Sequence, residues 1–231
     1  MTETRGQAHI VIAIDGPVGA GKSTVARGVA RRLGYRYINT GAMYRAVAWE
    51  ALRRRVSLED PSALGEIARD LPIRFRETPD EQRLMIRGED LTEAVSDPSV
   101  SEAASLVSAH PPVRQALVAV QRQLGAAGGV VMEGRDIGTV VFPDAEVKVF
   151  LSASPEERAL RRFRELRSLG LEVEFEDIRA AEEARDRRDA QRAYSPLQVA
   201  EDAVVVDTTG KSADEVVEEV LAVCRSRLHV V

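Results

Sequence analysis

Residues 16–23 read Gly-Pro-Val-Gly-Ala-Gly-Lys-Ser, in which four residues separate a glycine from a glycine-lysine-hydroxyl triplet. This spacing is typical of a phosphate-binding loop, because its glycines let successive backbone N–H groups point toward an anion. The helix expected after the loop would present its positive end to the same anion. Lys22 would add a charge at the outer phosphates, and the Ser23 hydroxyl would bind the Mg²⁺ that accompanies a nucleotide. The triphosphate-binding residues expected here are Gly16, Pro17, Val18, Gly19, Ala20, Gly21, Lys22, Ser23 and Thr24.

The segments on both sides of this loop predict a strand before it and a helix after it. Residues 10–14 are an apolar run typical of a buried strand, and residues 25–33 follow a helical pattern. Gly34 would end that helix, and residues 35–38 read as a second strand. Further strands are expected at residues 128–132, 146–151 and 203–206, with the last helix at residues 216–228. The alternation of strands and helices predicts an α/β fold with a five-stranded parallel sheet.

The composition predicts a globular protein whose partners are small molecules. The 231 residues are 44% hydrophobic and 30% charged, and the formal net charge of −5 argues against general binding to nucleic acid or to an anionic membrane. No apolar run is long enough for a membrane helix, and none resembles a signal peptide. We therefore expect a cytoplasmic monomer without a nucleic acid or membrane partner. Cys224 is the only cysteine, so we expect it to be a small core residue.

The stretch between the second and third strands interrupts the alternating order and predicts an insertion. Residues 73–76 and 83–87 alternate on either side of a turn at residues 78–81, which indicates an antiparallel hairpin. Helical patterns resume at residues 100–107 and, after two prolines, at residues 113–124. Ser105 and Arg114 lie on these helices with no local signal that sets them apart. From the pattern alone, both are expected at the surface.

Polar residues follow two strands of the expected sheet. Residues 39–45 come directly after the second strand, and residues 133–136, Glu-Gly-Arg-Asp, come after the third. Open α/β sheets bind their ligands at the carboxyl ends of their strands, so both clusters are candidates for a ligand site. Thr40 by itself would also fit the N-cap of the following helix.

Arginines gather on the two helices expected after the fourth strand. The first of these begins with a capping box at Ser154 and Glu157. The second spans residues 175–192 and places a charged set on one face. That face could be solvated, with an intrahelical ion pair between Arg185 and Asp189, or it could bind phosphate, since guanidinium forks match phosphate oxygens. The residues concerned are Arg158, Arg161, Arg162, Arg164 and Arg167 on the first helix, and Arg185, Arg188, Asp189 and Arg192 on the second.

The phosphate-binding loop also occurs in nucleotide-dependent switches and in kinases of small metabolites. Residues 207–210, Asp-Thr-Thr-Gly, match a short switch pattern, but they follow the fifth strand, and no Asn-Lys-x-Asp guanine-reading motif occurs. A shikimate kinase is shorter and lacks so large an insertion. Another nucleoside monophosphate kinase or small-metabolite kinase stays open as the alternative, with a switch less favoured.

Four segments of the chain resemble bacterial cytidylate kinases. They are residues 14–17, Ile-Asp-Gly-Pro; residues 40–45, Thr-Gly-Ala-Met-Tyr-Arg; residues 133–143, Glu-Gly-Arg-Asp-Ile-Gly-Thr-Val-Val-Phe-Pro; and residues 188–197. The resemblance covers nearly the whole chain and implies ATP- and Mg²⁺-dependent phosphorylation of CMP and dCMP. It also implies the strand order 2-3-1-4-5. The implied domains are a core of residues 1–40, 111–155 and 175–231, a monophosphate-binding insertion of residues 41–110, and a lid of residues 156–174.

The resemblance also implies roles for individual residues. The catalytic residues would be Lys22, Arg135, Arg162, Arg185 and Arg188. The base side of the acceptor pocket would be formed by Thr40, Tyr44, Ser105, Arg114 and Asp136. Arg45 and Arg135 would hold the monophosphate, Asp189 with Arg185 would meet the sugar, and Arg188 and Arg192 would lie near phosphates. Arg158 and Arg162 would close over ATP. Two residues depart from the family pattern, since Asn39 and Glu133 stand where the family often has aspartate.

Overall fold

The computed structural model describes residues 10–78 and 82–228 and divides the chain into two compact units. The core unit comprises Met1–Tyr37 and Ala127–Val231, and the insertion unit comprises Ile38–Ala126. Residues 111–126, which the sequence placed in the core, therefore group with the insertion. Residues 79–81 of the expected turn lie outside the described residues. Within the described part of the chain, no helix is long and apolar enough to span a membrane.

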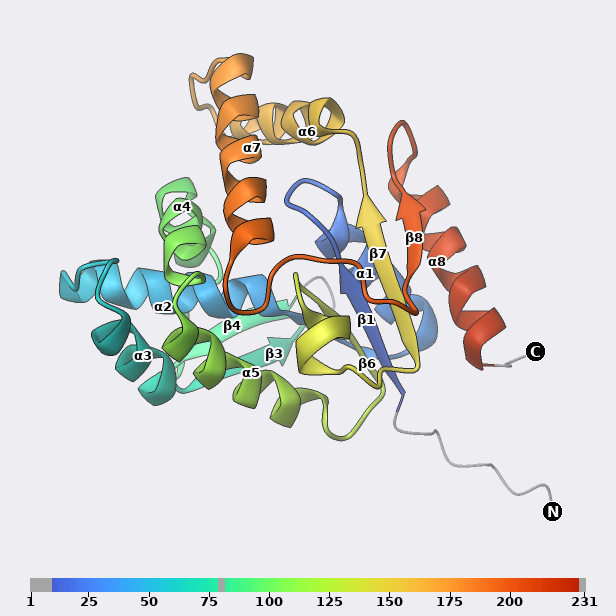
Figure 1. Ribbon diagram of the computed structural model, residues 1–231, viewed down its shortest axis with the longest axis horizontal. Helices are drawn as coiled ribbons and strands as arrows, with labels where there is room; N and C mark the ends of the chain where they lie inside the picture. Colours follow the sequence, from blue (N-terminus) through green and yellow to red (C-terminus); the bar gives the residue numbers. More distant parts are fainter. Residues whose placement is uncertain (1–9, 79–81, 229–231) are drawn as a thin grey trace. The chain divides into compact units, whose positions relative to one another are not determined.

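The core unit is built on a five-stranded sheet, ordered β2 (Arg36–Asn39), β6 (Val130–Glu133), β1 (Val11–Asp15), β7 (Val147–Ser152) and β8 (Val204–Asp207). Counted within this sheet alone, these are its second, third, first, fourth and fifth strands. β1 runs parallel to both β6 and β7, and β7 runs parallel to β8 (Figure 1). All five residues of β1 are buried, and four of them, residues 11–14, belong to the apolar run that predicted this strand. The expected α/β class with a five-stranded parallel sheet is confirmed.

Among the described residues the core unit holds four α-helices, and the expected capping box and Gly34 mark two of their ends. The helices are α1 (Lys22–Leu33), α6 (Pro155–Ser168), α7 (Phe175–Gln191) and α8 (Ala213–Leu228). The Ser154 hydroxyl accepts a hydrogen bond from the Glu157 amide at 3.2 Å, which caps the start of α6. α1 packs against α8 (Figure 1), and Cys224 of α8 is buried in this core, as expected. A short π-helical turn, η2 (Ile137–Val141), follows β6.

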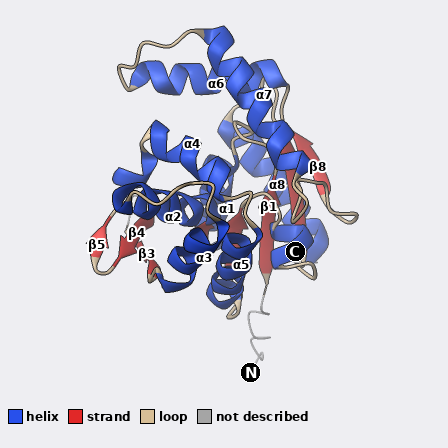
Figure 2. Cartoon of the chain, turned by 60° about the vertical axis from the view of Figure 1, so that its left-hand side comes forward, coloured by secondary structure: helices blue, strands red, loops and turns tan. Residues whose placement is uncertain are grey.

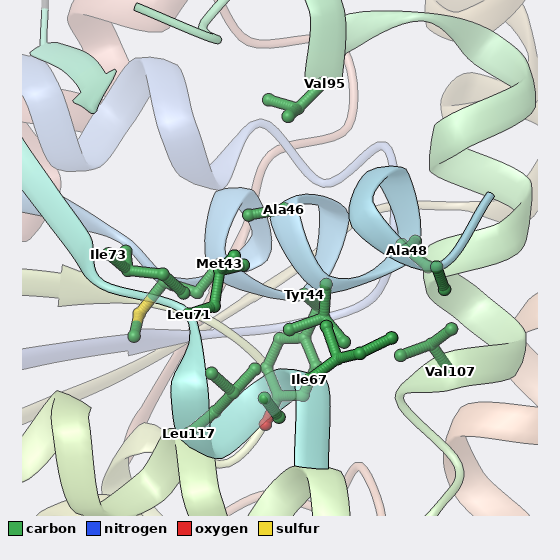
Figure 3. Packing of buried hydrophobic residues seen from close by; sticks show 14 of the residues in the cluster. Met43, Tyr44, Ala46, Ala48, Ile67, Leu71, Ile73, Val95, Val107 and Leu117 are labelled. Carbon is green, nitrogen blue, oxygen red and sulfur yellow. The ribbon is translucent and has the colours of Figure 1, made fainter. Parts of the chain in front are cut away.

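The insertion unit combines helices with a small sheet. Its helices are α2 (Thr40–Arg54), α3 (Pro61–Asp70), α4 (Pro98–Val107) and α5 (Pro111–Gly125), with a 3₁₀ turn, η1 (Ala94–Ser96). The expected hairpin is confirmed as β3 (Ile73–Glu77) paired with β4 (Gln82–Ile86), and a two-residue strand, β5 (Glu89–Asp90), extends it (Figure 2). Met43 of α2, Ile67 of α3 and Leu117 of α5 belong to one buried cluster (Figure 3). This shared core explains why α5 belongs with the insertion.

Within the insertion unit, the buried carboxylate of Glu50 links α2 to the residue that follows β4. The Glu50 side chain is 0% exposed and accepts hydrogen bonds from Arg53 at 2.9 Å and Arg54 at 2.8 Å. Arg87, which follows β4, is the third residue to donate a hydrogen bond to Glu50, at 3.1 Å. These three donors, Arg53 most strongly, outweigh the cost of burial and lower the pKa of Glu50 from 4.5 to about 2.

Glu50→Gln is expected to lower the free energy of unfolding by about 1–3 kcal/mol near neutral pH, because charge-assisted hydrogen bonds are lost in a buried place. Since the pKa of Glu50 is lowered in the folded protein, its contribution is complete above the ordinary value of 4.5 and is lost as the pH falls toward 2. Urea unfolding of both proteins, at about pH 7 and about pH 3, measures the effect. The difference should shrink at the lower pH, and an equal difference at both values would contradict this account.

Candidate active site

The phosphate-binding loop adopts a backbone that its glycines require. Gly16 has φ 148°, and a Cβ at this position would lie 2.2 Å from the Leu151 carbonyl oxygen of β7. Gly19 has φ 73°, and a Cβ there would lie 2.8 Å from the Cβ of Arg158 on α6. Side chains at either position would therefore push the loop away from the strand and helix that flank it. The loop is packed between β1, β7 and the start of α6.

Lys22 lies at the first position of α1 and reaches back across this loop. It is 6% exposed, and its Nζ donates a hydrogen bond to the Pro17 carbonyl oxygen at 2.6 Å. Burial, together with the positive charge of Arg135, lowers the pKa of Lys22 from 10.5 to about 7. An ammonium group that is buried near another positive charge is stabilised by an anion, such as a phosphate, that enters the loop.

A hydroxyl and a carboxylate, those of Ser23 and Glu133, lie together beside the loop. The Ser23 hydroxyl donates a hydrogen bond to Glu133 Oε1 at 2.6 Å, and the Tyr37 hydroxyl donates to the same oxygen at 3.1 Å. Glu133 is buried at the end of β6, where it is in register with Ile14 of the neighbouring β1. A hydroxyl and a carboxylate suit Mg²⁺, which takes few protein ligands and completes its shell with phosphate oxygens and water. A glutamate at position 133, in place of the family's frequent aspartate, therefore still reaches Ser23.

Asp189 of α7 gathers two arginines in the core unit. Its carboxylate accepts a hydrogen bond from Arg135 Nε at 2.9 Å and a short one from Arg192. Both the Asp189 and Arg192 side chains are 4% exposed. Burial opposes the charged carboxylate, but the two guanidinium groups outweigh it and lower the pKa of Asp189. This part of the charged face is thus enclosed, which contradicts the solvated alternative.

The remaining charged residues of α7 differ in their surroundings. Arg185 is half-buried, and Arg188 is exposed on the last turn of the helix. The Asp189 carboxylate accepts hydrogen bonds from Arg135 and Arg192, and the positive charge of Arg185, four residues earlier on α7, also helps to lower the pKa of Asp189.

Arg158 and Arg161 attach α6 to the phosphate-binding loop. Arg158 is buried, donates to the Val18 carbonyl oxygen at 3.1 Å, and forms an ion pair with Asp186 of α7 at 2.6 Å. Arg161 donates to the carbonyl oxygens of Gly19 at 3.4 Å and Thr208 at 2.7 Å. The sequence pattern did not indicate that Arg161, among the arginines of this helix, would contact the loop.

Arg162, which the resemblance placed near ATP, forms an ion pair with Glu165 on its own helix at 2.8 Å. Arg161 and Arg162 fall three and four residues after Arg158, and both spacings lie on the same side of a helix. The helical period alone therefore could not decide which of the two meets the loop.

The insertion unit encloses a second set of predicted residues. Arg114 is 1% exposed, its guanidinium lies 5.2 Å from the centre of the Tyr44 ring, and its Nη1 donates to the Ser108 carbonyl oxygen at 3.1 Å. Ser105 is 3% exposed. The expectation that Ser105 and Arg114 lie at the surface is therefore wrong, because α4 and α5 turn these positions inward and an aromatic face and a carbonyl receive the guanidinium.

The start of α2 corrects a second expectation. Thr40 is the first residue of the helix and is buried, whereas the N-cap is Asn39, whose Oδ1 accepts a hydrogen bond from the Ala42 amide at 3.0 Å. Asn39 thus has a local role for which an amide oxygen suffices. Arg45 lies half-buried one turn later, with its Nη1 3.4 Å from where a Cβ on Gly41 would lie.

Asp136 belongs to the core unit and stands directly before η2. The residue is 3% exposed, and its carbonyl oxygen accepts hydrogen bonds from the Val140 and Val141 amides at 2.9 and 3.1 Å. Its side chain makes no capping hydrogen bond to this turn. Asp136 therefore places a carboxylate in an enclosed position next to Arg135.

The chain is similar to several known proteins. The family profile described as cytidylate kinase matches residues 12–226. Proteins named cytidylate kinase from Desulfitobacterium hafniense and Syntrophotalea carbinolica are 46% and 48% identical over 221 and 222 residues. These matches cover 96% of this chain and 95% and 94% of the two relatives. An uncharacterized protein from Eubacterium ventriosum, solved by crystallography, has a TM-score of 0.53 at 14% identity, covering 95% of this chain and 99% of that one, and shares the fold.

Proposed function

The chain belongs to the cytidylate kinase family and phosphorylates CMP, and we propose that it uses Mg²⁺-bound ATP as the donor and accepts dCMP as a second substrate. The observation that carries this proposal is the family match over residues 12–226, which includes the phosphate-binding loop with its buried Lys22. A kinase of CMP and dCMP would serve pyrimidine nucleotide metabolism.

On the donor side, the backbone of residues 16–24 would hold the phosphates of ATP, and Lys22 would neutralise charge on the transferring group. Ser23 and Glu133 would hold Mg²⁺, directly or through water, and the bound ion would supply charge neutralisation at the phosphate oxygens. Arg158 and Arg161 would keep the loop in place through their bonds to the carbonyl oxygens of Val18 and Gly19. Arg162 would contact ATP after leaving its ion pair with Glu165.

Transfer itself requires in-line oxygens and cations around a phosphoryl group whose charge is spread over three oxygens. Arg135, Arg185, Arg188 and Arg192 would supply these cations from the core unit, together with Lys22. Asp189 supports this role, because its bonds to Arg135 and Arg192 fix the direction of both guanidinium groups before the substrates bind. It would also contact the sugar, with Arg185.

On the acceptor side, Arg45 and Arg135 would bind the monophosphate, while Thr40, Tyr44, Ser105, Arg114 and Asp136 would bind the base. The burial of Ser105 and Arg114 supports a binding role, since enclosed polar groups can discriminate between bases that a solvated surface would not. Asp136 offers an acceptor for the amino group of cytosine.

A steady-state panel tests the proposal. The purified full chain is assayed with Mg²⁺ and ATP against CMP, dCMP, UMP, AMP and GMP, and each diphosphate is quantified. We expect CDP and dCDP to form far faster than the other products. Faster turnover of a purine monophosphate would identify a different nucleoside monophosphate kinase. GTP hydrolysis that is unaffected by CMP, without diphosphate formation, would instead favour a switch.

A further inference from the structure

Asp15 is a buried carboxylate that the proposed reaction does not yet use. It is the last residue of β1, directly before the phosphate-binding loop, and it is 5% exposed. Both of its oxygens accept hydrogen bonds from backbone amides 122 and 123 residues away: Oδ1 from Ile137 at 2.9 Å and Oδ2 from Gly138 at 2.7 Å. The carboxylate therefore holds a specific piece of backbone.

That backbone is the start of η2, which comes immediately after Arg135 and Asp136. The first amides of a helical turn have no partner within it and are commonly satisfied by the side chain at the N-cap. Asp136 occupies the N-cap of η2 and is a residue type well suited to that task, yet it makes no capping bond there. Instead, the Asp15 carboxylate accepts the hydrogen bonds of the first two amides of η2 from a neighbouring strand.

The segment beyond η2 is also fastened from a neighbouring strand. Lys148 of β7 is in register with Ala13 of β1, and its Nζ donates a short hydrogen bond to the Pro143 carbonyl oxygen and another to Asp202 at 2.8 Å. The stem of Lys148 packs closely over Gly138, where a Cβ would lie 3.1 Å from Lys148 Cδ. The turn is therefore held between β1 and β7.

An apolar residue at position 15 would avoid the cost of burying a charge. Burial raises the pKa of Asp15 from 3.8 to about 6, although the Gly138 and Ile137 amides counteract it. The cost to stability is thus present above about pH 6 and fades as the pH falls toward 3.8. A gain in stability therefore does not explain why position 15 holds a carboxylate. Its hydrogen bonds to the η2 turn do explain it.

We propose that Asp15 is a positioning residue for acceptor recognition: it caps η2 from β1 and thereby fixes the backbone that carries Arg135 and Asp136. This inference rests on the proposed acceptor roles of those two residues. It assigns Asp15 to the acceptor side of the reaction, although in sequence it adjoins the loop that binds the donor.

Asp15→Asn tests the inference, because an amide keeps the shape but can accept only one of the two backbone hydrogen bonds through its oxygen. A displacement of about 1 Å can cost about 100-fold, so we expect kcat/KM for CMP to fall by about 10- to 100-fold, chiefly through KM, with KM for ATP within about 2-fold. The CMP/UMP preference should narrow as Asp136 moves. The control is Asp60→Asn, because Asp60 accepts from the Ser62 and Ala63 amides through Oδ1 alone, at the exposed start of α3, so its asparagine can keep both bonds. It should leave all constants unchanged.

Two outcomes would overturn the inference while leaving the proposed function intact. In the first, the wild type phosphorylates CMP and Asp15→Asn leaves kcat and KM for CMP and ATP unchanged. The other is a loss that affects ATP and CMP equally and follows the fraction of unfolded protein. Should Asp15→Asn not fold, Gly138→Ala decides, since its Cβ would lie 3.1 Å from Lys148 Cδ and 3.5 Å from Asp15 Oδ2 and would disturb the same turn while the Asp15 carboxylate is kept. It should raise KM for CMP selectively, and an equal effect on KM for ATP would overturn the inference. Absence of CMP turnover in the wild type would refute the proposed function instead.

Discussion

Lys22→Ala is expected to lower kcat/KM for phosphoryl transfer by about 1000-fold or more, because the donor phosphates would lose a cation placed across their binding loop. Its Nζ already lies over the loop, 2.6 Å from the Pro17 carbonyl oxygen, so the group needs little rearrangement to meet a phosphate. Initial rates with saturating CMP and varied ATP measure the loss. Lys211→Ala is the matched control, since Lys211 forms an ion pair with Glu219 on α8 and should leave activity unchanged.

Unfolding measurements on proteins changed at Lys22 separate a catalytic role of this residue from a structural one. The pKa of Lys22 is lowered to about 7, so burial of its ammonium group costs stability below that pH, and the cost fades as the pH rises toward 10.5. Lys22→Met, which keeps the length of the side chain, should therefore unfold at the same urea concentration as the wild type or at a higher one. Near-normal turnover in Lys22→Ala, or a loss of activity that follows a loss of fold, would contradict the assignment of the loop.

Patterns that are local in the sequence predicted most of the fold. The apolar run before the loop became β1, the alternation around residues 78–81 became the β3–β4 pair, and the capping box before Pro155 began α6. α3 was missed, although Asp60 and Pro61 form a start signal, with two amides donating to the Asp60 side chain. This helix has only ten residues and lies directly before the alternating pattern of the hairpin.

Contacts between distant segments explain what the sequence could not predict about the site. The burial of Arg114 depends on Tyr44, which lies on another helix, and the choice of Arg161 depends on the carbonyl oxygens of Gly19 and Thr208. Asp15 and the η2 turn are more than 120 residues apart. A short stretch of sequence carries no sign of contacts between residues so far apart. The phosphate-binding loop could be predicted because all its parts are adjacent in the chain.

Asp136→Ala is expected to narrow the preference for CMP over UMP by about 100-fold or more. Cytosine presents an amino donor where uracil presents a carbonyl acceptor, and a site built to bond such a group can reject the analogue by about 10⁴-fold. Removing the carboxylate should therefore lower kcat/KM for CMP strongly and that for UMP little. Arg45→Ala is the control, because both substrates carry the same phosphate and both should weaken alike. Asp136→Asn sharpens the test, since its amide can donate to uracil.

The competing explanation is that Asp136 only orients Arg135, in which case its loss would weaken both substrates equally. The structure gives Arg135 another carboxylate for that purpose, since its Nε donates to Asp189 of α7 at 2.9 Å. Orientation of Arg135 should therefore survive in the Asp136→Ala enzyme, while Asp189→Asn should weaken CMP and UMP to the same extent. An unchanged CMP/UMP ratio in Asp136→Ala, with both values of kcat/KM reduced, would rule out the base-reading role and leave Asp136 as a support for its neighbour.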